Sequence, residues 1–249
     1  MSEPWRLRVD PPAPGARNMA LDEELLDAVA AGTSPPTLRF YGWSPPCLSL
    51  GYFQPADLVD LEACGRFHVD VVRRPTGGRA ILHDRELTYS LSLPLAALGE
   101  EQAVVPSYRR LSLALVAGLR QAGYPVQAQP QAVDHRRESS PACFDRPAQH
   151  EVLLGGRKVV GSAQVRRGGA LLQHGSILFT PQVEETVRLL RLTAPQREEL
   201  RATMAAGVGG LESVHPVDPA ELVAAIAQAI GQEFAVRILP LAGKTTRTR

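Results

Sequence analysis

The sequence lacks several features that would assign it to a class at once. It has no run of about 20 apolar residues, the length that a transmembrane helix needs, and its N-terminal residues contain no apolar signal-peptide segment. Its three cysteines, Cys47, Cys64 and Cys143, are widely spaced and form no CxxC, which argues against a disulfide framework and a zinc ribbon. The six histidines show no HExxH motif or other metal spacing. We therefore expect a soluble cytoplasmic protein that binds no metal and does not attach to a membrane.

An excess of charge of one sign is also missing. The 249 residues include 27 Lys and Arg against 26 Asp and Glu, whereas nucleic-acid-binding proteins usually carry a clear basic excess. The contents of 44% hydrophobic and 21% charged residues are ordinary for a globular chain. We expect no nucleic-acid partner and one monomeric domain over residues 1–249, with a core at about 15–240 and a solvated tail at 241–249.

The hydrophobic pattern predicts helices and strands in an irregular order. The absence of a βαβαβ rhythm indicates an α+β fold with a mixed, largely antiparallel sheet flanked by helices. The first two expected strands are joined by a turn at Ser44-Pro45-Pro46, and the glycine pair Gly155-Gly156 indicates a hairpin. Helices are expected at about 17–32, 107–121 and 218–231, with two short ones within 182–206; strands are expected at 37–43, 47–53, 67–74, 86–95, 151–156, 157–165, 170–180 and 234–241.

A glycine pair directly after the strand expected at 67–74 is the first candidate site. The segment reads RRPTGGR over residues 73–79 and is followed by His83. Two glycines let the backbone turn tightly and approach a ligand closely. The segment is neither GxGxxG nor a Walker P-loop, so a hairpin turn with exposed arginines is an equal alternative.

Cys143 is the second candidate because of the segment that precedes it. That segment is polar, bounded by prolines, and carries Arg136 and Arg137. Exposed thiols are selected against unless they are used. Cys47 and Cys64 lie in apolar contexts instead, which is typical of buried, unreactive cysteines.

Two expected strands carry the remaining candidates. Lys158 is followed by the small residues Gly161, Ser162 and Ala163, which leave room for a substrate to lie against the sheet. An ammonium near a thiol lowers its pKa and makes thiolate available. His174 lies inside the next apolar strand, where a hydrogen-bonded structural histidine is the more common case.

Three ordered blocks resemble a known family. They are RRPTGGRAILHDRELTYS (73–90), CFDRPAQHEVLLGGRKVVGSAQ (143–164) and LLQHGSIL (171–178). They are similar to the biotin/lipoate protein ligase superfamily, and most similar to the octanoyltransferases of lipoate assembly that carry their cysteine in a CFxxP segment. NMALDE (18–23) and RFYGWSPPCLSLGYFQ (39–54) fit the same family, so the resemblance covers about residues 15–180.

This resemblance implies an acyltransferase. It would take octanoyl from octanoyl-acyl carrier protein, hold it on Cys143 as a thioester, and pass it to a lysine of a lipoyl-domain protein such as glycine cleavage H protein. Lys158 would be the second catalytic residue, and no cofactor is expected. The substrate-binding residues would be Arg73, Arg74, Thr76, Gly77, Gly78, His83, Gly161, Ser162, Ala163 and His174.

Three alternatives remain open at the level of sequence. An ATP-dependent lipoate-protein ligase would need ATP and Mg²⁺ but no protein thiol. Against it, the glycine turn reads GGR where many ligases have GGG, and we expect no extra C-terminal domain of the kind that many ligases carry. An octanoyl amidotransferase between lipoyl domains could use the same thiol. A non-catalytic acyl-binding or lipoyl-domain-binding module would not need both Cys143 and Lys158.

Overall fold

The computed structural model describes residues 3–129 and 151–240. Cys143, Arg136 and Arg137 lie outside the described residues, as does the tail expected at 241–249. Within the described part of the chain, no helix is long and apolar enough to cross a membrane.

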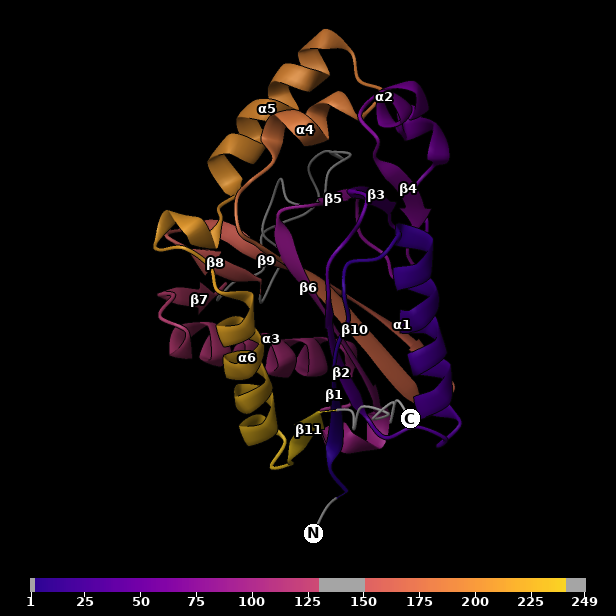
Figure 1. Ribbon diagram of the computed structural model, residues 1–249, viewed down its shortest axis with the longest axis vertical. Helices are drawn as coiled ribbons and strands as arrows, with labels where there is room; N and C mark the ends of the chain where they lie inside the picture. Colours follow the sequence, from indigo (N-terminus) through magenta and orange to yellow (C-terminus); the bar gives the residue numbers. More distant parts are fainter. Residues whose placement is uncertain (1–2, 130–150, 241–249) are drawn as a thin grey trace, which may run out of the picture.

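A large mixed sheet runs through the molecule (Figure 1). β1 lies parallel to both of its neighbours, β2 and β11, and the remaining neighbours pair antiparallel. The sequence prediction of a largely antiparallel sheet flanked by helices is therefore confirmed. In spatial order the strands are β11 (Ile238–Pro240), β1 (Trp5–Val9), β2 (Thr37–Tyr41), β6 (Glu86–Pro94), β10 (Ala170–Leu178), β9 (Arg157–Arg167), β8 (Val152–Leu154) and β7 (Val126–Ala128).

A second, three-stranded sheet lies at one end of the molecule, at the top of Figure 1. Its central strand, β3 (Cys47–Leu50), pairs parallel with β4 (Asp70–Arg73) and antiparallel with β5 (Ile81–His83). Three helices gather at the same end: α2 (Leu61–Arg66), α4 (Val183–Arg188) and α5 (Ala194–Gly207). The strands β2 and β3, which the turn at residues 44–46 connects, thus belong to different sheets.

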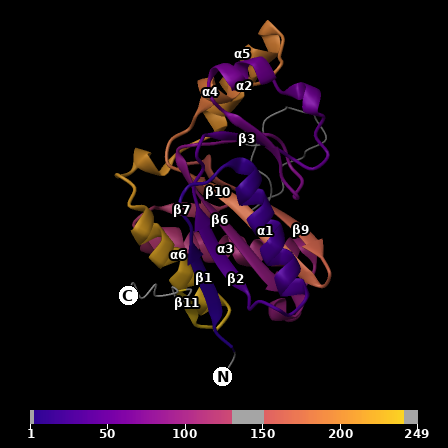
Figure 2. The same cartoon turned by 45° about the vertical axis from the view of Figure 1, so that its right-hand side comes forward.

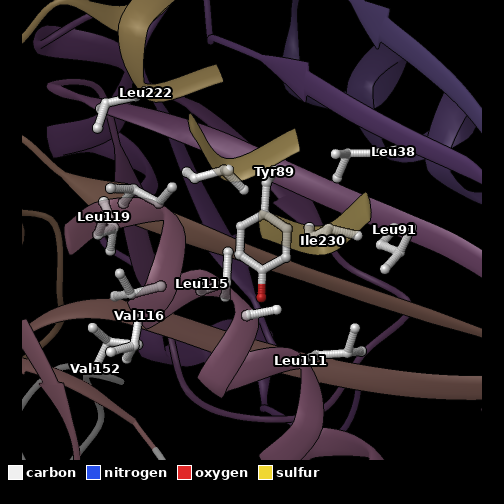
Figure 3. Close-up of a cluster of buried hydrophobic side chains, with 14 of the residues drawn as sticks. Leu38, Tyr89, Leu91, Leu111, Leu115, Val116, Leu119, Val152, Leu222 and Ile230 are labelled. Carbon is white, nitrogen blue, oxygen red and sulfur yellow. The ribbon is translucent and has the colours of Figure 1, made fainter. Parts of the chain in front are cut away.

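Helices cover both faces of the large sheet (Figure 2). α1 (Gly15–Ala30) lies on one face, and α3 (Val104–Gln121) and α6 (Pro219–Glu233) pack together on the other. Because side chains alternate along a strand, β6 sends Leu87, Tyr89, Leu91 and Leu93 towards α3 and α6. Figure 3 shows Tyr89 surrounded by the buried side chains of this main core, among them Leu111, Leu115, Leu119, Leu222 and Ile230.

Local signals explain several element boundaries. Gly155 and Gly156 have φ of +55° and +80°, the left-handed values that a tight hairpin between β8 and β9 requires. Asp218 caps α6 by accepting hydrogen bonds from the backbone N–H groups of Ala220 and Glu221. The expected helix therefore begins where predicted, although α6 continues to Glu233, past Gly231.

Candidate active site

A pocket lies between the two sheets and α1, and the surface that it exposes is almost entirely apolar. Its wall contains seven of the residues that the sequence singled out, from the glycine turn, β5, β9 and β10. The complete lining is Met19, Tyr41, Trp43, Ser49, Arg74, Gly78, Ile81, His83, Thr88, Gly161, Ser162, Ala163, His174, Gly175 and Ser176.

Small residues on β9 and β10 create the room for this pocket. Gly161 pairs with Ser176, and Ser162 pairs with Gly175 on the neighbouring strand. A β-carbon on Gly175 would lie 2.6 Å from the Gly161 carbonyl oxygen and 2.7 Å from Ser162 Oγ, closer than real contacts allow. Gly161, Ser162 and Ala163 line the pocket, and that a substrate lies against them stays a prediction.

The glycine turn is built around a buried arginine. Arg74 is 3% exposed, and it donates hydrogen bonds to the carbonyl oxygens of Gly77 (2.8 Å) and Arg79 (2.7 Å) and to Ser49 Oγ (3.1 Å). The turn connects β4 to β5, which pair with opposite edges of β3. The alternative of a hairpin with exposed arginines is therefore wrong for Arg74. Gly78 has φ of +93°, a conformation that favours glycine.

The other residues of the first candidate segment take different positions. Arg73 donates through Nη1 to the carbonyl oxygens of Gly51 (2.8 Å), Tyr52 (2.9 Å) and Gln54 (2.7 Å). Arg73 and Gly77 line a separate groove next to the pocket.

His174 belongs to a buried hydrogen-bonded chain. Its Nε2 lies 2.7 Å from Thr76 Oγ1, and its Nδ1 lies 3.1 Å from Asp22 Oδ2. Burial lowers the pKa of His174, despite the opposing effect of Asp22, so the ring is neutral at pH 7. The hydrogen-bond network then assigns the proton to Nδ1, which donates to Asp22, while Nε2 accepts from Thr76. His174 thus ties the glycine turn to α1.

Asp22 is the charged centre of this chain, and sequence reasoning did not identify it. Arg39 Nη1 donates to its Oδ1 (2.7 Å), Ser90 Oγ donates to the same oxygen (2.8 Å), and the Tyr41 hydroxyl donates to Oδ2 (2.9 Å). Burial would raise the pKa of Asp22, but the contacts with His174, Arg39 and Ser90 together lower it. Asp22 is therefore ionised inside the protein. A polar residue beside Leu21 on the inner face of a predicted helix was the available signal.

A second histidine, His83, also lines the pocket. Its Nε2 is 2.7 Å from Ser49 Oγ, and its Nδ1 is 2.8 Å from Glu86 Oε1. The Trp43 ring stacks on the imidazole with 4.1 Å between centroids and 14° between planes. Ser176 also donates to Glu86 Oε1, at 2.9 Å. One face and both nitrogens of His83 are thus positioned by neighbours, and neither Trp43 nor Glu86 was singled out from the sequence.

Lys158 lies three residues before Gly161 on β9. Its Nζ donates to Glu151 Oε1 at 2.5 Å, and the two side chains are 1% and 6% exposed. A buried ammonium needs such a partner, because removing an unpaired charge from water is costly. Glu151 is the first described residue after the segment that contains Cys143. Glu151 was not among the sequence candidates.

The two described cysteines are unsuited to nucleophilic chemistry. Cys47 and Cys64 are buried, and burial raises the pKa of both thiols. Both therefore stay protonated at neutral pH, and the prediction that they are structural is confirmed. In residues 3–129 and 151–240, no group of three or more His, Cys, Asp or Glu side chains is placed to hold a metal ion.

Comparison with known proteins agrees with this architecture. The family model described as the lipoyl protein ligase A/B catalytic domain matches residues 14–231. An octanoyltransferase LipM from Kyrpidia tusciae is 42% identical over 95% of this chain and 89% of its own length. One from Moorella thermoacetica is 42% identical over 96% of this chain and 89% of its own.

Solved structures show the same fold at lower identity. A lipoate-protein ligase A bound with ATP aligns with a TM-score of 0.72 and 22% identity, over 97% of this chain and 91% of that one. The bipartite lipoate protein ligase of Thermoplasma acidophilum, studied with its E2 lipoyl domain, aligns with a TM-score of 0.74 and 22% identity, over 98% of this chain and 89% of that one. On the family match and the close relatives together, the chain belongs to the lipoyl protein ligase A/B catalytic-domain family.

Proposed function

We propose that this chain is an octanoyltransferase that moves octanoyl from octanoyl-acyl carrier protein to a lysine of a lipoyl-domain protein, such as glycine cleavage H protein, through a thioester on Cys143. The octanoyltransferase relatives, 42% identical over nearly the whole chain, support the activity. In the structure, the observation that carries the proposal is the apolar pocket between the glycine turn and β9.

The apolar surface of the pocket suits an acyl chain. Its residues Met19, Trp43 and Ser49 are buried, whereas Ser162 and Ala163 on β9 are partly exposed. Each methylene buried there contributes about 0.8 kcal/mol to binding.

Two transfers complete the reaction. In the first, the Cys143 thiolate attacks the carbonyl carbon of the carrier-protein thioester; a new C–S bond forms, the old one breaks, and the carrier leaves as a thiol after taking a proton. In the second, the neutral amine of the acceptor lysine attacks the same carbon, the bond to Cys143 breaks, and the amine proton is lost as the amide forms. Because the conversion of a thioester into an amide is thermodynamically favourable, we expect no requirement for ATP. The Lys158 ammonium would stabilise the thiolate.

The first prediction concerns the thiol. After mixing with octanoyl-carrier protein without ATP, intact-mass measurement should show one octanoyl group on the wild type and on Cys64→Ser, and none on Cys143→Ser, because a neutral hydroxyl is a far weaker nucleophile than a thiolate. If Cys143→Ser kept most of the ATP-independent activity, the covalent route would be wrong. Octanoylation of the acceptor from octanoate with ATP and Mg²⁺, with no octanoyl group on the enzyme, would indicate the ligase, and loading of the enzyme only from an octanoylated lipoyl domain would indicate the amidotransferase.

The second prediction concerns Lys158. Lys158→Met should slow the acylation of Cys143 by about 100-fold or more. It should also move the pH dependence of Cys143 alkylation to higher pH, because the cation that favours thiolate is gone. Lys158→Arg, which keeps the charge, should shift the alkylation profile less. The Lys158→Met protein must be checked for folding, because Glu151 loses its buried partner. The same thiol pKa in wild type and Lys158→Met would remove the electrostatic role.

A further inference from the structure

A groove on the surface adjoins the acyl pocket. The two cavities share Arg74, and they take consecutive residues from the glycine turn, Gly77 and Gly78, and from β9, Ala163 and Gln164. The outer side of the groove is formed by an aromatic ledge, which consists of Tyr52 and Phe53.

The aromatic ledge is exposed to an unusual degree. Phe53 is 88% exposed and Tyr52 57%, and the two rings meet edge to face with centroids 4.9 Å apart. Exposed aromatic pairs next to a groove are typical of protein-protein contact sites, where Tyr and Phe are enriched. The proposed transfer chemistry makes no use of either ring.

The loop that carries the ledge is held in one conformation. Arg73 bonds to three of its carbonyl oxygens, Gln54 Oε1 accepts from the Gly51 N–H (3.0 Å), and the Tyr52 N–H donates to the Thr76 carbonyl (2.9 Å). A β-carbon on Gly51 would lie 1.9 Å from the Gly78 carbonyl oxygen, so this loop packs directly on the glycine turn. A preordered apolar surface loses little entropy when a partner binds.

The charge of the groove favours an acidic partner. Its lining includes Arg73, Arg74 and Arg167; Arg167 is paired with Glu23 and Asp27, so the positive charge of the groove comes from Arg73 and the buried Arg74. The contacts of Arg73 with carbonyl oxygens leave its positive charge in place. A positive groove attracts a negatively charged protein surface and speeds its approach.

We propose that the aromatic ledge and its groove dock the acidic acyl-donor protein, and not the acceptor; this rests on the proposed function. Gln164 in the groove lies six residues from Lys158 along β9, about 20 Å at the rise of an extended strand. A donor whose acyl group hangs on a long prosthetic arm can dock at that distance and still reach the catalytic centre. An acceptor presents its lysine on one side chain, so its body must dock much closer.

The test separates the two half-reactions and uses two donors. Acylation of Cys143 is followed by intact mass with octanoyl-carrier protein and with octanoyl-N-acetylcysteamine, a small thioester with no protein attached. Discharge of preloaded enzyme to a lipoyl domain is followed in the same way. The variants are Phe53→Ala and Phe53→Glu; the control is Phe67→Ala, at a phenylalanine that is 43% exposed and lies next to α2, outside the groove lining.

Phe53→Ala should lower kcat/KM for the carrier protein about tenfold, and Phe53→Glu should lower it further, with no change for the small thioester, for discharge, or in Phe67→Ala. The wild-type rate with the carrier protein should fall as salt is added. Equal effects on both donors, or a defect confined to discharge, would overturn the docking assignment. A wild type that neither donor loads would refute the proposed function itself.

Discussion

The two faces of the large sheet differ in chemistry although they are built from the same strands. Towards α3 and α6, β2 and β6 present Leu38, Phe40, Tyr89 and Leu91 to a continuous apolar core. Towards α1, the alternate residues of the same strands include Arg39 and Ser90, which bond to the buried Asp22. The first face supplies stability, and the second holds charges and hydroxyl groups next to the pocket that we propose for the acyl chain. Strand alternation therefore lets one sheet carry an apolar core on one face and the proposed binding site on the other.

The difference between the two faces can be tested by destabilising each face with one substitution of similar cost. Asp22→Asn leaves the charge of Arg39 without its buried carboxylate, and Leu119→Ala opens a cavity in the opposite core. Each should lower the free energy of unfolding by about 3 kcal/mol in denaturant titrations. Only Asp22→Asn should also lower the octanoylation rate per folded molecule, because it releases His174 and the glycine turn. Equal activity of the two folded variants would show that the polar face serves stability alone.

Two neighbouring glycines allow the conformation of the glycine turn to be tested. Gly78→Ala forces a side chain into φ of +93° and should cost about 1 kcal/mol of stability and distort the pocket wall. At Gly77, a β-carbon would meet no described atom within 4 Å, so Gly77→Ala should be tolerated. Thermal unfolding and loading rates measured side by side distinguish the two, and identical behaviour would argue that the turn conformation has no role.

The smallest expected effect is a dependence of stability on pH. Burial lowers the pKa of His174, so as pH falls below about 6.5 the unfolded chain takes up a proton before the folded one. Stability from this residue is complete above that pH and is lost on going down towards the folded-state pKa. The pKa values of the Asp22 and Asp10 carboxyls are also lowered, so these groups reduce the free energy of unfolding only near pH 4 and below. The slope of unfolding free energy between pH 7 and 5 should therefore flatten in His174→Gln, and an unchanged slope would contradict the assignment.

Long periodic elements could be predicted from the sequence, and short ones could not. α1, α3, β6 and β10 have nine to 18 residues and repeat their apolar positions clearly. β5 has only three residues and α2 six, too few for a period to show. The sequence also did not show that β2 and β3 belong to different sheets, because a short turn between two strands usually makes a hairpin.

The sequence likewise identifies only those site residues whose type is unusual at their position. The glycine turn and the Gly-Ser-Ala run on β9 could be found because such residues are unusual around strands. Met19 and Trp43 look like ordinary core residues, and Glu151 looks like a surface charge, until the fold brings them to the pocket and to Lys158. These contacts form only when the chain folds back on itself, and a local pattern does not show them.

The stacking of Trp43 on His83 gives the protein an optical property. The chain has two tryptophans, and the other, Trp5, packs against Phe234, with ring centroids 4.8 Å apart, on the far side of the large sheet. In Trp5→Phe, all indole emission would therefore come from the wall of the acyl pocket. An acyl chain that displaces water from that wall would shift the emission to the blue, so pocket filling can be followed in real time without any label.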